Sequence, residues 1–139
     1  MITDQHMATG WEHLVGVRRI TAELNAVHAE IQSGTSPIRN LTLKEEDDVM
    51  KWKCEMADFD DGCEGGRALN EDLRNHAAKP GGIGHLELEI TFPRNYPSAP
   101  FFVRVVRPRC VMYTGHVTAG GSVCMELLSG GGCVRACVH

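Results

Sequence analysis

Residues 85–108 read HLELEITFPRNYPSAPFFVRVVRP, and this segment carries the strongest indication of the fold. In residues 85–92 apolar and polar side chains alternate, which is the pattern of a half-buried β-strand. The apolar members are Leu86, Leu88, Ile90 and Phe92. Pro93, Pro97 and Pro100 exclude a regular helix or strand in the next segment. Residues 101–106 resume a strand pattern that ends before Pro108, so we expect two neighbouring strands joined by an irregular connection.

The chain before this segment contains two further strand patterns. In residues 49–56, VMKWKCEM, apolar positions alternate with charged ones and place Cys54 on the buried side as a core thiol. Residues 38–43, IRNLTL, are the candidate partner strand. Residues 60–84 are rich in Gly, Asp, Glu and Asn and predict a long connection, in which residues 68–77 form either a short helix or a brief edge strand.

Residues 14–32, LVGVRRITAELNAVHAEIQ, have the periodicity of a helix. Apolar residues recur at intervals of three and four and therefore form one stripe. The stripe consists of Val17, Ile20, Leu24, Val27 and Ile31. Gly34 and Pro37 follow as the expected stop. A helix followed by an antiparallel meander of about four strands predicts the α+β class.

Composition limits the class of protein. A length of 139 residues fits one domain, and an apolar fraction of 42% is enough for a core. The net charge of −4, without a basic run, argues against nucleic acid as a partner. No apolar run approaches the ~20 residues of a membrane-spanning helix, and the first residues lack the features of a signal peptide. We therefore expect a protein of the cytoplasm or nucleus that needs no membrane and no cofactor.

The six cysteines are expected to be free thiols, because no signal peptide directs the chain to an oxidising compartment. Cys133, Cys137 and His139 lie close together, but their C-x3-C-x-H spacing is not that of a usual zinc motif, and the chain contains no CxxC pair. We expect no metal site. A small metal-binding protein that uses this C-terminal group is the alternative.

Cys124 has a distinctive setting. Residues 109–124 have three glycines and no clean period, which predicts an irregular loop. Cys124 ends this loop and is followed by the apolar residues Met125, Leu127 and Leu128. A packed neighbour on one side and a loop on the other suit a nucleophilic thiol. The alternative is a buried cysteine that acts as a small apolar side chain.

The order of these motifs resembles the ubiquitin-conjugating enzyme fold. The two most specific pieces are FPRNYPSAP at residues 92–100 and GGSVCMELL at residues 120–128, and the second is most similar to the Q-type subgroup. The resemblance runs from Val17 to Leu128. It implies a core domain over residues 14–128 and a divergent Gly/Cys-rich tail over residues 129–139.

The resemblance implies an acyl transfer through a cysteine thioester. Cys124 would accept ubiquitin from the activating enzyme and pass it to a substrate lysine or a ligase. The partners implied are ubiquitin, the activating enzyme, a ubiquitin ligase and protein substrates. His116 takes the place of the family's usual asparagine and would either donate to an oxyanion or support the loop. The alternative is a catalytically impaired pseudoenzyme that binds ubiquitin or a conjugating partner.

The resemblance also implies where partners bind. Arg18 and Arg19 lie off the apolar stripe, on the helix that meets the activating enzyme in this family, so they are either a solvated face or a docking patch. Ligases contact the loop that here contains Tyr96, Pro97 and Ser98. Because Ser98 is small and polar, a contact with a RING-type ligase is expected to be weak.

After Leu128 the sequence departs from the family pattern and reads SGGGCVRACVH. Three consecutive glycines do not start a stable helix, since each costs about 1 kcal/mol relative to alanine. The family's C-terminal helices are therefore expected to be mostly missing. The acidic residue that assists lysine attack has no counterpart either, so thioester formation is expected to be more efficient than transfer to lysine.

Overall fold

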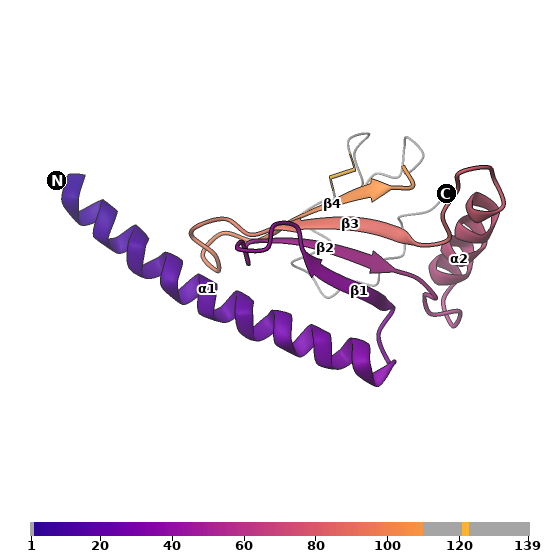
Figure 1. The fold of residues 1–139 in the computed structure, drawn as a ribbon, viewed down its shortest axis with the longest axis horizontal. Helices are drawn as coiled ribbons and strands as arrows, with labels where there is room; N and C mark the ends of the chain where they lie inside the picture. Colours follow the sequence, from indigo (N-terminus) through magenta and orange to yellow (C-terminus); the bar gives the residue numbers. More distant parts are fainter. Residues whose placement is uncertain (1, 110–120, 123–139) are drawn as a thin grey trace.

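The computed structural model describes residues 2–109, 121 and 122. It contains two helices, α1 (Ile2–Ser33) and α2 (Glu64–Ala77), and four strands. The strands are β1 (Ile38–Leu43), β2 (Lys51–Met56), β3 (Leu86–Thr91) and β4 (Phe102–Arg107). They form one antiparallel sheet in the order β1-β2-β3-β4, with α1 running along it (Figure 1). The predicted α+β class, a helix followed by a four-stranded meander, is confirmed.

Alternation along the strands gives the sheet an apolar face and a polar face. On the apolar face, two rows of paired residues cross all four strands: Leu41, Cys54, Leu88 and Val105, and then Leu43, Trp52, Ile90 and Val103. On the polar face, the first polar row is Asn40, Glu55, Glu87 and Arg107, and the second polar row is Thr42, Lys53, Glu89 and Arg104. The strand patterns in the sequence therefore predict which side of each strand is buried.

The core lies between the apolar face and α1. Ile20 is completely buried, and Leu24, Val27 and Ile31 pack against the same cluster, as their spacing predicts. The aromatic rings of Phe92, Trp52 and Tyr96 stack edge to face, with centroid separations of 4.8 Å for Trp52–Phe92 and 4.9 Å for Phe92–Tyr96. Such contacts add specificity to the area that the rings bury.

The helix α1 begins earlier than the sequence predicts. The prediction starts at residue 14, whereas α1 starts at Ile2 and its first part extends beyond the sheet (Figure 1). Trp11 in this part is 71% exposed, so it does not continue the buried stripe that reveals the rest of the helix. The predicted stop is correct, since Gly34 adopts a φ of 73° and its N–H donates to the Ile31 carbonyl at 3.2 Å.

Residues 68–77 belong to a helix, α2, and not to an edge strand. The Cys63 thiol caps this helix, because its Sγ accepts from the Gly66 N–H at 3.3 Å. Inside the helix, the Asn70 side chain bonds both the N–H and the carbonyl of Phe59, and Leu73 is buried. The helix α2 lies beyond the ends of β2 and β3, where it connects them (Figure 1).

Cys54 is a core thiol, as the alternation predicts. It is 4% exposed on the apolar face. Burial, followed by the nearby Glu55 carboxylate, raises the pKa of the Cys54 thiol to about 11. Cys54 therefore stays protonated at neutral pH and is no candidate nucleophile.

Candidate partner-binding surface and a charged cluster on the sheet

The predicted nucleophile Cys124 and its predicted helper His116 lie outside the described residues, as do the proposed domain end at residue 128 and the tail. The chain just before Cys124 is described at Gly121 and Ser122. The Val105 N–H donates to the Gly121 carbonyl at 2.7 Å, and Ser122 forms an isolated antiparallel bridge with Arg104. The chain therefore pairs with β4 immediately before Cys124.

Gly121 is required for this pairing. Its φ is 92°, a region that side chains other than glycine rarely adopt. A Cβ atom at Gly121 would also overlap the backbone carbonyl of Val105. Both observations explain why a glycine precedes the predicted nucleophile at this point of the sequence.

Four exposed residues form a second stripe on α1, separate from the buried one. Trp11, Leu14, Val15 and Arg18 recur at intervals of three, one and three, which places them on one face of the helix. The exposed fractions of the first three are 71%, 59% and 45%. A group of large exposed apolar residues is typical of a surface that contacts another protein. We call these four residues the α1 stripe.

The structure joins α1 to the loop between β3 and β4, which contains Tyr96, Pro97 and Ser98. The Tyr96 hydroxyl donates to Glu23 Oε1 at 3.4 Å, and the same oxygen lies 3.6 Å from Arg19 Nε. Burial raises the pKa of Tyr96, and the Glu23 carboxylate raises it further. Arg19, one of the predicted partner-binding residues, thus also supports the position of Tyr96.

Gly16 brings α1 and this loop close together. A Cβ atom at Gly16 would overlap the backbone carbonyl of Tyr96, so only glycine permits the observed approach. Tyr96 itself is buried, whereas Pro97 and Ser98 are exposed beside it. Arg19, Pro97 and Ser98, which the sequence predicts to bind partners, therefore lie near one another, whereas the α1 stripe lies on the other side of the helix from Gly16.

Sequence reasoning missed the apolar residues of the α1 stripe. Trp11 precedes the predicted helix, and Leu14 and Val15 are its first two residues, so their shared face was not recognised. The signal was present, because their spacing continues through Arg18 with a helical period.

The described helices contain no segment that is long and apolar enough to cross a bilayer.

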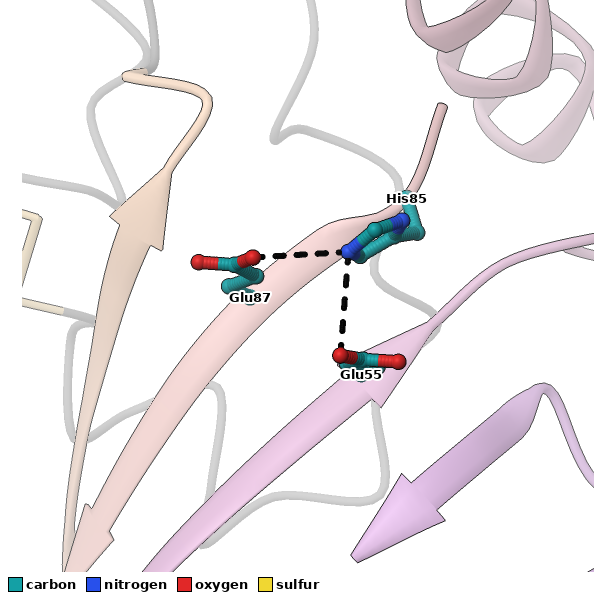
Figure 2. Close-up of side chains that lie close together, drawn as sticks. All are labelled: Glu55, His85 and Glu87. Carbon is teal, nitrogen blue, oxygen red and sulfur yellow. Dashed lines mark ion pairs between the residues drawn. The ribbon is translucent and has the colours of Figure 1, made fainter. Parts of the chain in front are cut away.

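A second group that sequence reasoning missed is the charged cluster of Glu55, His85 and Glu87. Figure 2 shows the His85 ring pointing between the two carboxylates from the start of β3. Its Nε2 lies 3.5 Å from Glu87 Oε1 and 3.9 Å from Glu55 Oε1. These are ion pairs only when the imidazole is protonated. The cluster combines side chains from two strands that are separated in the chain by α2.

Arg107 holds one member of this cluster. Its guanidinium donates two hydrogen bonds to Glu87, at 2.6 Å and 2.8 Å. The hydrogen bond from Arg107 is the main cause of the lowered pKa of Glu87. Glu87 therefore stays ionised and keeps a fixed orientation beside His85.

Comparison with known proteins gives related sequences. A Q-like ubiquitin-conjugating enzyme protein of Drosophila melanogaster is 27% identical over 127 residues, which are 91% of this chain and 37% of that protein. Human ubiquitin-conjugating enzyme E2 Q1 is 36% identical over 83 residues, which are 60% of this chain and 18% of that protein. This chain thus spans well under half of these relatives. No family model matches it.

Among solved structures, a Plasmodium vivax ubiquitin conjugating enzyme E2 is similar, with 18% sequence identity and a TM-score of 0.49. The similarity covers 80% of each chain. The curated relatives agree with the resemblance that the motifs predict, down to the Q-type subgroup.

Proposed function

From homology to Q-type ubiquitin-conjugating enzymes, we propose that this chain carries a conjugating core that accepts ubiquitin as a thioester on Cys124. The observation that carries the proposal is the similarity to the Q-like protein of Drosophila melanogaster over 91% of the chain. The proposed partners are ubiquitin, its activating enzyme, a ligase and protein substrates, in the cytoplasm or nucleus.

The proposed reaction is a pair of acyl transfers. The Cys124 thiolate attacks the carbonyl carbon of the thioester that joins ubiquitin to the activating enzyme, and the thiolate of that enzyme leaves. In the second step a lysine amine attacks the new thioester, the carbon–sulfur bond breaks, and Cys124 leaves as a thiolate while the amine loses a proton to solvent. A thiol suits both steps because the thiolate is a good nucleophile and a good leaving group.

Two features of the described residues support this role. The pairing of Gly121 and Ser122 with β4 fixes the chain just before Cys124 to the edge of a rigid sheet. The α1 stripe on one face of the helix, and Arg19, Pro97 and Ser98 beside the β3–β4 loop, are exposed residues that a protein partner can contact. Catalytic residues are commonly placed in loops that a rigid scaffold positions.

A charging assay tests the proposal. The full chain is incubated with activating enzyme, ATP and ubiquitin, and the products are separated with and without thiol reductant. We expect an adduct that reductant removes in the wild type. Cys124→Ser should give an adduct that resists reductant, because an oxygen ester replaces the thioester. Cys54→Ala serves as the matched cysteine control and should charge like the wild type, since Cys54 is buried. Folded wild-type protein that forms no adduct would contradict the proposal.

The alternative function is a module that binds ubiquitin or a conjugating partner without charging. One observation favours it, namely that the exposed α1 stripe and the exposed Pro97 and Ser98 lie on elements that do not include Cys124. It predicts that titration with a partner gives the same affinity for the wild type and for Cys124→Ala, and that neither protein charges. If Trp11→Ala no longer bound the partner but still formed the thioester adduct, the α1 stripe would be the binding surface of a conjugating enzyme instead.

A further inference from the structure

The first polar row contains two opposed carboxylates. Glu55 on β2 and Glu87 on β3 are direct partners in the antiparallel register, and both project from the polar face. Like charges directly opposite each other destabilise a sheet. The second polar row has no such conflict, since Lys53, Glu89 and Arg104 alternate in sign across the strands. The first row therefore has one carboxylate more than its own cation, Arg107, can neutralise.

His85 brings a nitrogen atom to these carboxylates. Its Nε2 exposes less than 1 Å² and has no hydrogen-bond partner among the described residues. The nearest oxygens are the carboxylate atoms Glu87 Oε1 and Glu55 Oε1. A protonated imidazole would satisfy this nitrogen through ion pairs with both carboxylates. A neutral imidazole with its proton on Nδ1 would instead direct the Nε2 lone pair at the two carboxylates, and one cation between the three side chains would then satisfy all three.

The distances fit a small transition-metal ion. The three ligand atoms, one nitrogen and two oxygens, all lie within 4.8 Å of one another. Tetrahedral zinc with bonds of 2.0–2.2 Å needs ligand atoms about 3.3–3.6 Å apart. The Nε2–Glu87 distance of 3.5 Å is already in this range, whereas the Nε2–Glu55 distance of 3.9 Å and the separation of the two carboxylate oxygens, which is within 4.8 Å, require the Glu55 side chain to move inward.

Arg107 completes the surroundings that such a site requires. Metal-binding carboxylates are usually held by hydrogen bonds from neighbouring groups, which fix their orientation. The two hydrogen bonds from Arg107 do this for Glu87, one to each carboxylate oxygen, and each oxygen can accept a second partner. Glu55 is 43% exposed, so water can occupy the fourth position.

We propose that Glu55, His85 and Glu87 bind one Zn²⁺ ion on the polar face of the sheet. The mixed imidazole and carboxylate donors favour zinc over magnesium or calcium, which prefer oxygen alone. The ion links β2 to the start of β3, at the point where the chain arrives from α2. The site uses none of the C-terminal residues Cys133, Cys137 and His139, and it does not use Cys124.

The test is a zinc titration of the full chain, monitored by NMR of the histidine side chains. The His85 signal, assigned by its loss in His85→Ala, should shift in a saturable manner with one equivalent of Zn²⁺ and should not shift with Mg²⁺. Glu55→Gln should weaken this response by more than about tenfold. Glu89→Gln is the matched control, because Glu89 lies on the same strand and face but outside the cluster, and it should respond like the wild type.

Binding to cysteines must be separated from binding at the cluster. Co²⁺ replaces Zn²⁺ in a parallel titration, since thiolate ligands give a charge-transfer absorption band that nitrogen and oxygen ligands do not. Metal at the cluster should bind without this band and should be lost in His85→Ala. If the His85 signal is unaffected by Zn²⁺, or if His85→Ala and Glu55→Gln bind the same number of ions as the wild type, the proposal is wrong.

Discussion

The two faces of the sheet come from the same strands, but one is organised by burial and the other by the pairing of charges. Every row on the apolar face is buried against α1 or lies beside it, and each of its residues contributes to one cluster. On the polar face the two rows differ, because the second polar row alternates in charge whereas the first polar row places Glu55 opposite Glu87. The difference shows that strand register, and not alternation along one strand, decides which charges meet on the polar face.

The largest effect should come from the apolar face. Trp52 is 5% exposed and packs edge to face on Phe92, so Trp52→Ala should lower the free energy of unfolding by about 3–5 kcal/mol. Its sequence neighbour Lys53 lies on the polar face and is exposed. Lys53→Ala should change stability by less than about 0.5 kcal/mol. Urea unfolding monitored by circular dichroism measures both, and equal losses would remove the distinction between the faces.

A smaller effect should appear at alkaline pH. The pKa of Cys54 is raised by burial from 9.0 to about 11, so the unfolded chain loses this proton first. The contribution of the buried thiol to stability is thus complete below pH 9 and is lost as pH rises through 11. We expect a loss on the order of 1–2 kcal/mol between pH 8 and pH 11. Cys54→Ala should lack this part of the loss in parallel unfolding curves. The same pH dependence in the wild type and in Cys54→Ala would show that the Cys54 thiol is not buried in the core.

The smallest effect should have the opposite sign. Glu55→Gln removes one of two opposed carboxylates, so in EDTA at pH 8 it should raise the free energy of unfolding by about 0.2–1 kcal/mol. The matched change on the balanced row, Glu89→Gln, removes the partner of Lys44 and should not stabilise the fold. Thermal unfolding detects the difference. A loss of stability in Glu55→Gln under these conditions would mean that the first polar row is not under electrostatic strain.

The sequence predicts the apolar face well because alternation is a local property of each strand. Cys54 could be assigned to the core from its neighbours alone. The conflict between Glu55 and Glu87 could not, because it depends on the register of two strands that α2 separates in the chain. The early start of α1 was missed because Trp11, which precedes the predicted helix, is exposed and does not continue the apolar stripe of Ile20. Cys124 and His116 stay predictions.

The length of α1 has a geometric consequence. Trp11 lies nine residues before Ile20, which corresponds to about 14 Å along the helix axis at 1.5 Å per residue. The helix is held to the core from Gly16 onward, where Gly16 meets the Tyr96 backbone and Ile20 is buried. A protein that binds Trp11 would therefore contact α1 about 14 Å from the first core contact of Ile20.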